Sequence, residues 1–436
     1  MIIKKLPAKN NWREHRMEVK IIKGGTLIDG TGKPPLKDSI VVIQGSRIKS
    51  AGRKGEVDIP KGEGVELIGA AGKTVMPGLI DSHLHMGIFG QSREFYSMPI
   101  HNNCLDIAMK AVPCLKKTLE MGITTVRDGG SGWGWFEVAL KNAINRGDII
   151  GPRYLATGYH LTVTGGHGYF LPPWLARFAP TEQTGMFCDG PDEWRKAARL
   201  NISNGTDNVK LVASRGFLSS GLRGDAPPTA AQASVEEMKA AIDEAHKMGK
   251  KVFAHANGPQ AIMNAIEAGV DSIVHGFYID EKCAEMMVKK KIILEPTTLC
   301  IRLVRDYGKG EMLDSMVEKA AAYWEVKEKE FKMVLEKGVT ISFASDMGCP
   351  YLYHGENARE LACCVKLGMK PMEAIVSATK TAAQAVGLGD QIGTIEKGKN
   401  ADIIMVEGNP LRNIEILQKE EKIKMVMKEG RIVITR

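Results

Sequence analysis

The sequence predicts an α/β protein: a (β/α)8 TIM barrel joined to a small β-sandwich domain that both ends of the chain build together. Three observations predict it. Short β-like segments separated by glycine-rich turns occupy the first part of the chain, and the same texture returns at its end. Between them, buried strand-like runs alternate with amphipathic helical patterns, which indicates a parallel sheet. Residue types that bind metals stand at the ends of several of those runs.

The two ends of the chain are expected to form one domain. Residues 17–77 contain "SIVVIQGSRIKSAG", and residues 388–436 contain "KIKMVMKEG", in which apolar runs are cut by glycine every few residues. The second stretch is too short to bury a core alone. We therefore expect residues 17–77 plus 388–436 to form the β-sandwich, with residues 78–387 inserted as the barrel and residues 1–16 as a basic extension.

Residues 78–387 alternate strand-like runs with helical patterns. The segment 234–249, for example, places apolar residues at 235, 238, 242, 245 and 248, the spacing of one helix face. The eight predicted strands are 78–85, 123–128, 153–159, 208–214, 251–256, 272–276, 292–297 and 340–346. In a barrel of this kind, catalytic groups lie at the carboxyl ends of the strands.

Composition and charge exclude several classes of protein. Hydrophobic residues make up 44% and charged residues 25% of the 436 residues, as in an ordinary globular protein. The net charge is +8, but residues 1–23 alone hold seven Lys or Arg against two Glu, and no basic stripe suited to nucleic acid follows. We therefore expect no nucleic-acid partner and no membrane partner.

The expected location is the cytoplasm. The first residues lack the apolar core of an export signal, and no apolar run approaches the length of about 18 residues that a membrane helix needs. The eight cysteines show no CxxC spacing, so they are expected to be reduced thiols.

Metal-ligating residue types stand at the ends of four predicted strands. His83 and His85 are two residues apart in the first strand, and alternate side chains of a strand share one face, so both can reach one ion. His255, His275 and Asp346 end the fifth, sixth and eighth strands. A buried histidine or a capping aspartate is common at any single position. Their occurrence together at one end of the barrel predicts a metal site.

Lys210, on the fourth predicted strand, is an unusual neighbour for a cation because a protonated amine would be repelled. Burial favours the neutral amine. A neutral amine can add carbon dioxide to form a carbamate, whose two oxygens can bridge two metal ions. The alternative is a lysine that extends to the rim of the barrel.

These residues and motifs resemble the metal-dependent amidohydrolase superfamily. The resemblance covers nearly the whole chain from about Met17 and includes "MPGLIDSHLH", the lysine of the fourth strand, the two single histidines, the "SD" of the eighth strand and "GTIEKGKNADIIMVEGNPL". The motifs "TTVRDGG" and "LTVTGGHG" are similar to the imidazolonepropionase-like and prolidase-like branch.

The resemblance implies a hydrolase that cleaves a carbon–nitrogen amide bond at two divalent metal ions, most simply zinc. In that arrangement a metal-activated bridging hydroxide attacks the carbonyl, and Asp346 is the general base. The implied ligands are His83, His85 and Asp346 for the more buried ion, His255 and His275 for the other, and carboxylated Lys210 as the bridge. The resemblance also implies a homo-oligomer.

The sequence identifies the substrate less sharply. His160 and His167 lie in a long loop after the third strand, Arg127 is near the end of the second strand, and Arg223 and Tyr278 follow the fourth and sixth strands. Arginine and histidine side chains at the open end of the barrel are suited to a small-molecule substrate with a carboxylate, such as an N-acyl amino acid, a dipeptide or a lactam. For Arg127 the alternative is a structural ion pair.

Two other functions stay open at this point. The first is hydrolytic deamination of a heterocycle at a single metal ion, against which Lys210 argues. The second is a non-catalytic relative in which the barrel serves as an assembly module, against which the complete set of ligand types argues.

Overall fold

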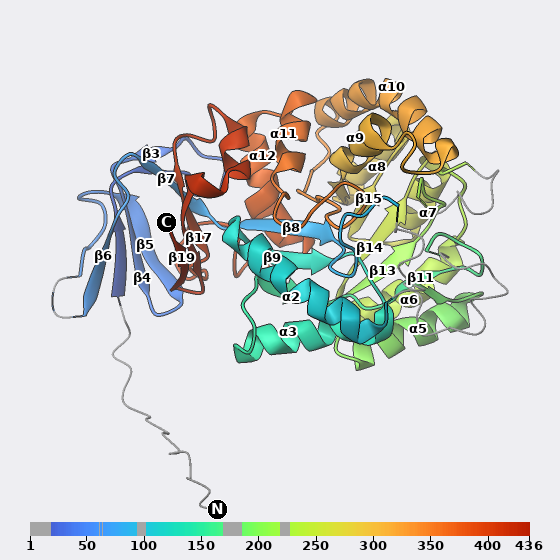
Figure 1. Cartoon of the computed structure of the whole chain (residues 1–436), viewed down its shortest axis with the longest axis horizontal. Helices are drawn as coiled ribbons and strands as arrows, with labels where there is room; N and C mark the ends of the chain where they lie inside the picture. The colour runs from blue at the N-terminus through green and yellow to red at the C-terminus, as the bar shows by residue number, and fades with distance from the viewer. Residues whose placement is uncertain (1–18, 61, 63, 94–101, 169–184, 219–226) are drawn as a thin grey trace, which may run out of the picture.

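A computed structural model describes residues 19–60, 62, 64–93, 102–168, 185–218 and 227–436. It is an α/β structure with mixed sheets (Figure 1). The basic extension predicted for residues 1–16 lies outside the described residues. No helix within the described ranges has both the length and the apolar character that crossing a membrane requires.

Strands from both ends of the chain share one six-stranded sheet. Its order is β19-β18-β17-β7-β2-β3, and β17 pairs antiparallel with β7. The strands are β2 (Thr26–Leu27), β3 (Leu36–Lys37), β7 (Lys73–Pro77), β17 (Ile403–Glu407), β18 (Ile423–Lys428) and β19 (Arg431–Thr435). Figure 1 shows strands from the two parts of the chain, such as β7 and β17, side by side at the left of the view.

A second sheet of four strands contributes to the same hydrophobic core. Its order is β5-β4-β1-β6. The strands are β1 (Val19–Lys23), β4 (Ser39–Gln44), β5 (Arg47–Arg53) and β6 (Val65–Gly69). Ile22 and Val41 of this sheet share a buried cluster with Val75, Ile403 and Met425 of the other, so apolar faces from both chain ends bury one another.

The middle of the chain forms parallel strands, as the sequence predicts. One sheet has the order β10-β9-β8 and another the order β12-β11-β13-β14-β15-β16. The strands are β8 (Leu79–Leu84), β9 (Ile123–Asp128), β10 (Arg153–Leu155), β11 (His160–Thr162), β12 (Gly185–Phe187), β13 (Asn208–Val212), β14 (Lys251–Ala256), β15 (Ser272–His275) and β16 (Ile293–Glu295).

The segment 340–347 links these two sheets, although it is not a continuous strand. Parallel bridges join Leu294 to Ile341 and Leu84 to Met347. The Asp346 N–H also donates to the His83 carbonyl at 2.8 Å. A full ladder is absent here because the Phe343 N–H donates to the Ser377 carbonyl instead of to a neighbouring strand. Asp346 is thereby fixed beside the end of β8.

Helices lie between successive strands and around them (Figure 1). The helices are α2 (Cys104–Glu120), α3 (Phe136–Arg146), α5 (Pro191–Ser203), α6 (Val235–Lys247), α7 (Pro259–Ala268), α8 (Glu281–Lys290), α9 (Thr298–Tyr307), α10 (Asp314–Glu336), α11 (Arg359–Lys366), α12 (Pro371–Val376) and α13 (Ala382–Ala385). Shorter helical segments are η1 (Trp133–Trp135), η4 (Ser377–Thr381), η5 (Ile414–Gln418) and η6 (Glu420–Lys422).

Helix α6 shows how local sequence sets these elements. Ser234 and Glu237 form a reciprocal capping box at its start. Met238 and Ile242 of the predicted apolar face are buried. Met248, predicted on the same face, is 62% exposed because the helix ends at Lys247.

Candidate metal centre

The carboxyl ends of the parallel strands bring the predicted ligands together. Lys210, His255 and His275 come from β13, β14 and β15, and these side chains line one cavity together with His85 and Asp346. His83 lies behind them and is fully buried, with its ring centroid 5.0 Å from that of His85 and 5.6 Å from that of His275. All six predicted ligands therefore meet at one place.

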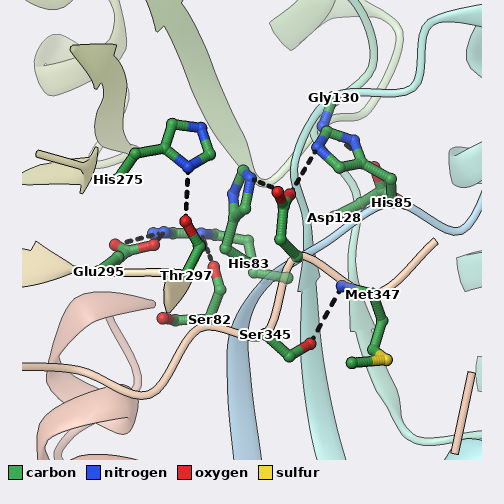
Figure 2. Close-up of polar contacts among 12 residues, drawn as sticks. Ser82, His83, His85, Asp128, Gly130, His275, Glu295, Thr297, Ser345 and Met347 are labelled. Carbon is green, nitrogen blue, oxygen red and sulfur yellow. Dashed lines mark hydrogen bonds and ion pairs between the residues drawn. The ribbon is translucent and has the colours of Figure 1, made fainter. Parts of the chain in front are cut away.

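His83, His85 and Asp346 form the tightest group. The Nε2 atoms of His83 and His85 lie 3.3 and 3.4 Å from the same Asp346 oxygen, Oδ1. One ligand atom from each of the three residues lies within 4.8 Å of the others. Figure 2 shows both imidazole rings turned toward this carboxylate. Two imidazoles and a carboxylate form a donor set that suits zinc and related divalent ions.

Several buried ligand atoms in this group make no hydrogen bond, and His83 Nε2 and Asp346 Oδ1 have only the contacts at 3.3 and 3.4 Å within the group. His83 Nδ1, His83 Nε2 and Asp346 Oδ1 are buried and make no hydrogen bond. An unsatisfied buried polar atom costs about 1–3 kcal/mol. Burial and the nearby Lys210 hold the pKa of His83 well below its usual range, so its ring is neutral, as a metal ligand must be. These residues thus fit a divalent metal ion.

His255 and His275 each use one ring nitrogen for the protein and keep the other. His275 Nδ1 shares a 2.6 Å hydrogen bond with the Thr297 hydroxyl, drawn in Figure 2. His255 Nε2 lies 2.9 Å from the Arg215 carbonyl, which can only accept, so Nε2 carries the proton. The second nitrogen of His255 therefore keeps a lone pair for a ligand, and that of His275 does so in the tautomer whose Nδ1 donates to Thr297. Hydrogen bonds of this kind orient metal-binding histidines.

Lys210 is buried on the same strand ends. Its side chain is 3% exposed, and Nζ lies 4.9 Å from the centroid of the Phe253 ring. Within the described residues it makes no hydrogen bond. Burial lowers the pKa of Lys210 to about 7, which Glu295 and Asp346 oppose and Arg127 supports. A substantial fraction of the amine is therefore neutral at physiological pH.

Arg127 is a structural residue, so its prediction as a substrate ligand is wrong. Its side chain is fully buried and does not line the cavity. Nε donates to the Ser82 carbonyl, Nη1 donates to the Ala385 carbonyl, and Nη2 lies 2.6 Å from both carboxylate oxygens of Glu295. The alternative of an ion pair is confirmed, with Glu295 as the partner.

Of the other predicted substrate residues, two line the cavity, one does not, and one lies outside the described residues. His160 and His167 line the cavity, and the His167 ring stacks on that of His255 at 4.1 Å between centroids. Burial lowers the pKa of His160 to about 3. Tyr278 does not line the cavity, because its ring packs against Tyr323 at 4.7 Å between centroids. Arg223 lies outside the described residues.

Asp81 is a buried carboxylate beside the predicted ligands that the sequence analysis did not single out. It accepts hydrogen bonds from the His83 N–H at 3.2 Å, from the Ser345 N–H and hydroxyl, and from Asn357 Nδ2 at 2.7 Å. It therefore joins β8 to the residue that precedes Asp346. Its place two residues before His83, on the same strand face, was the available signal.

Gly129 and an apolar wall were also missed. A Cβ at Gly129 would lie 2.6 Å from the Cε1 atoms of both His83 and His85, so only glycine fits beside these rings. The wall of the cavity contains Ile88, Val212, Phe217, Leu218, Phe277 and Ile301. Among the described residues, no arginine lines the cavity.

Comparison with known proteins decides the family. The model of the amidohydrolase family matches residues 74–433. The chain belongs to the amidohydrolase family. The resemblance found in its motifs is thereby confirmed, and the protein is a hydrolase that acts on carbon–nitrogen bonds.

Individual amidohydrolases are similar over nearly the full length. Ochratoxinase from Aspergillus niger is 33% identical, covering 95% of this chain and 86% of its own. Its crystal structure superposes with a TM-score of 0.85 at 29% identity, covering 96% of each chain. A Xaa-Pro dipeptidase with bound methionine gives a TM-score of 0.84 at 31% identity, covering 95% of this chain and 99% of that one.

Proposed function

We propose that this amidohydrolase cleaves an amide bond in a small molecule bearing a carboxylate, such as an N-acyl amino acid, a dipeptide or a cyclic amide. The observation that carries the proposal is the convergence of His83, His85 and Asp346 beside the cavity. Buried ligand atoms of His83 and Asp346 make no hydrogen bond there. The names of ochratoxinase and a Xaa-Pro dipeptidase among its relatives support the substrate class.

The proposed centre holds two divalent ions, with zinc as the first choice. His83, His85 and Asp346 would hold one, and His255 and His275 the other, through the nitrogens that the protein leaves free. Carboxylated Lys210 would serve both, and its buried, partly neutral amine is the form that reacts with carbon dioxide. When bound, such ions lower the pKa of water and polarise a carbonyl.

The protein side chains carry the proton transfers. Asp346 would accept a proton from the attacking water and deliver it to the leaving nitrogen. Burial raises the pKa of Asp346, but the imidazole contacts of His83 and His85 outweigh it and hold this pKa well below its usual range, so the carboxylate is ionised and ready to accept. Its burial beside an apolar wall keeps bulk water away.

His160 and His167 are the proposed substrate contacts among the described residues, because both line the cavity. The apolar wall around Phe217 and Phe277 is suited to the hydrocarbon part of a substrate. Arg223 stays a prediction, as does the homo-oligomer.

We further propose that the parallel strands close into a (β/α)8 barrel carrying residues 78–387. The bridges from Leu294 to Ile341 and from Leu84 to Met347 support closure on one side. The hydrogen bond from the Asp207 N–H to the Ala156 carbonyl supports it on the other. The shared sheets support a separate β-domain of residues 17–77 plus 388–436.

The test is a hydrolysis screen on zinc-loaded protein with N-acyl amino acids, dipeptides and lactams. The proposal predicts release of a free amine and a new carboxylate from at least one class, and loss of that activity in Asp346→Asn. Ammonia release from a heterocycle, without hydrolysis of any amide, would overturn it in favour of a deaminase.

A further inference from the structure

A pair of thiols lies close to Asp346 and is not part of the predicted ligand set. Cys300 is in the first turn of α9, and Cys349 follows Asp346 by three residues. Both thiols are buried, at 3% and 5% exposed, and both line the cavity. One atom each from Cys300, Cys349 and Asp346 lies within 4.8 Å of the others. These three residues are called the thiol site below.

The backbone fixes both cysteines in place. The Cys349 N–H donates to the Asp346 carbonyl at 3.2 Å, and the Cys349 carbonyl accepts from the Leu352 N–H at 2.9 Å. A Cβ at Gly348 would lie 2.4 Å from the His85 carbonyl, so this loop is held tightly against the end of β8. On α9, Glu360 accepts the N–H groups of Thr298 and Leu299, which anchors the turn that carries Cys300.

We propose that the thiol site binds thiophilic metal ions such as Cd²⁺. Two sulfur ligands and one carboxylate form a soft donor set, unlike the imidazole-rich set of His83, His85 and Asp346. Both cysteines line the cavity, so their sulfurs lie at its surface together with Asp346. An ion held there binds Asp346, whose Oδ1 has no hydrogen-bond partner in the protein.

The two donor sets share Asp346, so they compete for it. A thiophilic ion bound to Cys300 and Cys349 takes the carboxylate away from His83 and His85. Inhibition of amide hydrolysis by such an ion follows, and this consequence alone rests on the proposed function.

The experiment adds Cd²⁺ to the metal-loaded full-length protein and records the ultraviolet charge-transfer band of thiolate–cadmium bonds. The wild type is expected to gain a band that saturates near one ion per chain. Cys300→Ala and Cys349→Ala should each weaken Cd²⁺ binding about tenfold or more, since even indirect supports of a metal site contribute 10- to 100-fold. Cys363→Ala removes a buried cysteine of α11 outside the cavity and is the matched control.

An unchanged band in the double variant Cys300→Ala/Cys349→Ala, with folding confirmed by circular dichroism, would overturn the thiol site. So would the absence of any band in the wild type. Because the band reports sulfur coordination directly, it is independent of whether the protein hydrolyses an amide, and failure of the proposed function would leave it in place.

Discussion

Polar groups are buried both at the strand ends and in the interior just behind them. In the interior these groups are hydrogen bonded within the protein, whereas several at the strand ends are not. Behind the cavity, Arg127 and Glu295 are fully buried, and every nitrogen of the guanidinium has an acceptor. At the strand ends, His83 and Asp346 keep buried atoms without a partner. A satisfied buried pair maintains structure, whereas unsatisfied ligand atoms that converge indicate a place for something the protein binds.

Removing the proposed base should have the largest effect. We expect Asp346→Asn to lower kcat by about 10²- to 10⁴-fold, because a general base contributes on that order. Metal content should be measured on the same samples, since Asp346 is also a proposed ligand. A variant that stays fully loaded and keeps more than a tenth of the wild-type kcat would rule out the role as base.

The Arg127–Glu295 pair should dominate stability instead. Arg127→Met leaves the Glu295 charge buried and alone, which typically costs about 3–5 kcal/mol of unfolding free energy. The double variant Arg127→Met/Glu295→Leu should recover much of that loss. Urea denaturation in the presence of a chelator measures both.

The same assay sharpens the contrast with the strand ends. His83→Leu should cost the chelator-treated protein much less stability than Arg127→Met, because His83 makes no hydrogen bond and loses only its 3.3 Å contact with Asp346. A loss of unfolding free energy comparable to that of Arg127→Met would mean that His83 stabilises the fold rather than serving as a metal ligand alone.

Arg127 and Glu295 also show which features of the fold and the site could be predicted from the sequence and which could not. Seven of the eight predicted strands overlap observed strands, whereas 340–346 makes only an isolated bridge, and β11 and β12 were not predicted. Those seven strands and the approach of His83 to Asp346 were predictable, because strand periodicity and the carboxyl ends of parallel strands are local signals. The structural role of Arg127 could not be predicted, because the acceptors of its hydrogen bonds lie on β8, β16 and α13, far away in sequence. Tyr278 failed for a similar reason, since Tyr323 of α10 packs against its ring.

Thr297 connects the structural groups with the proposed metal ligands, because its hydroxyl shares a hydrogen bond with the ring of His275. We expect Thr297→Ala to weaken metal binding about 10- to 100-fold by releasing the ring of His275. Thr297→Ser keeps the hydroxyl and should restore binding. Thr298→Ala is the matched control, since the buried Thr298 hydroxyl has no partner. Equal losses in the Thr297 and Thr298 variants, measured by competition with a chelating dye, would remove the positioning role.

A gradual, pH-dependent effect concerns Glu360, whose buried carboxyl is hydrogen bonded and still costs stability when it is ionised. Burial raises the pKa of Glu360 to about 7, outweighing the N–H groups of Thr298 and Leu299. The raised pKa means that the folded state holds a proton that the unfolded state releases near 4.5. The stability contributed by this proton is therefore lost as the pH rises from about 4.5 to 7.

Unfolding free energies between pH 5 and 8 measure that loss. The wild type should lose up to about 1.4 kcal/mol per pH unit in this window relative to Glu360→Gln, which has no carboxyl to titrate. Parallel pH profiles for the two proteins would show that Glu360 titrates near its ordinary pKa.

The central claim is that the unpartnered atoms at the strand ends form a two-ion centre bridged through Lys210. Elemental analysis tests it most directly, on protein purified without chelator and with bicarbonate present, for the wild type and for Lys210→Ala. The account predicts about two divalent ions per wild-type chain and one or none in the variant. One tightly held ion in both proteins would contradict the bridge, and no metal in either would contradict the centre itself.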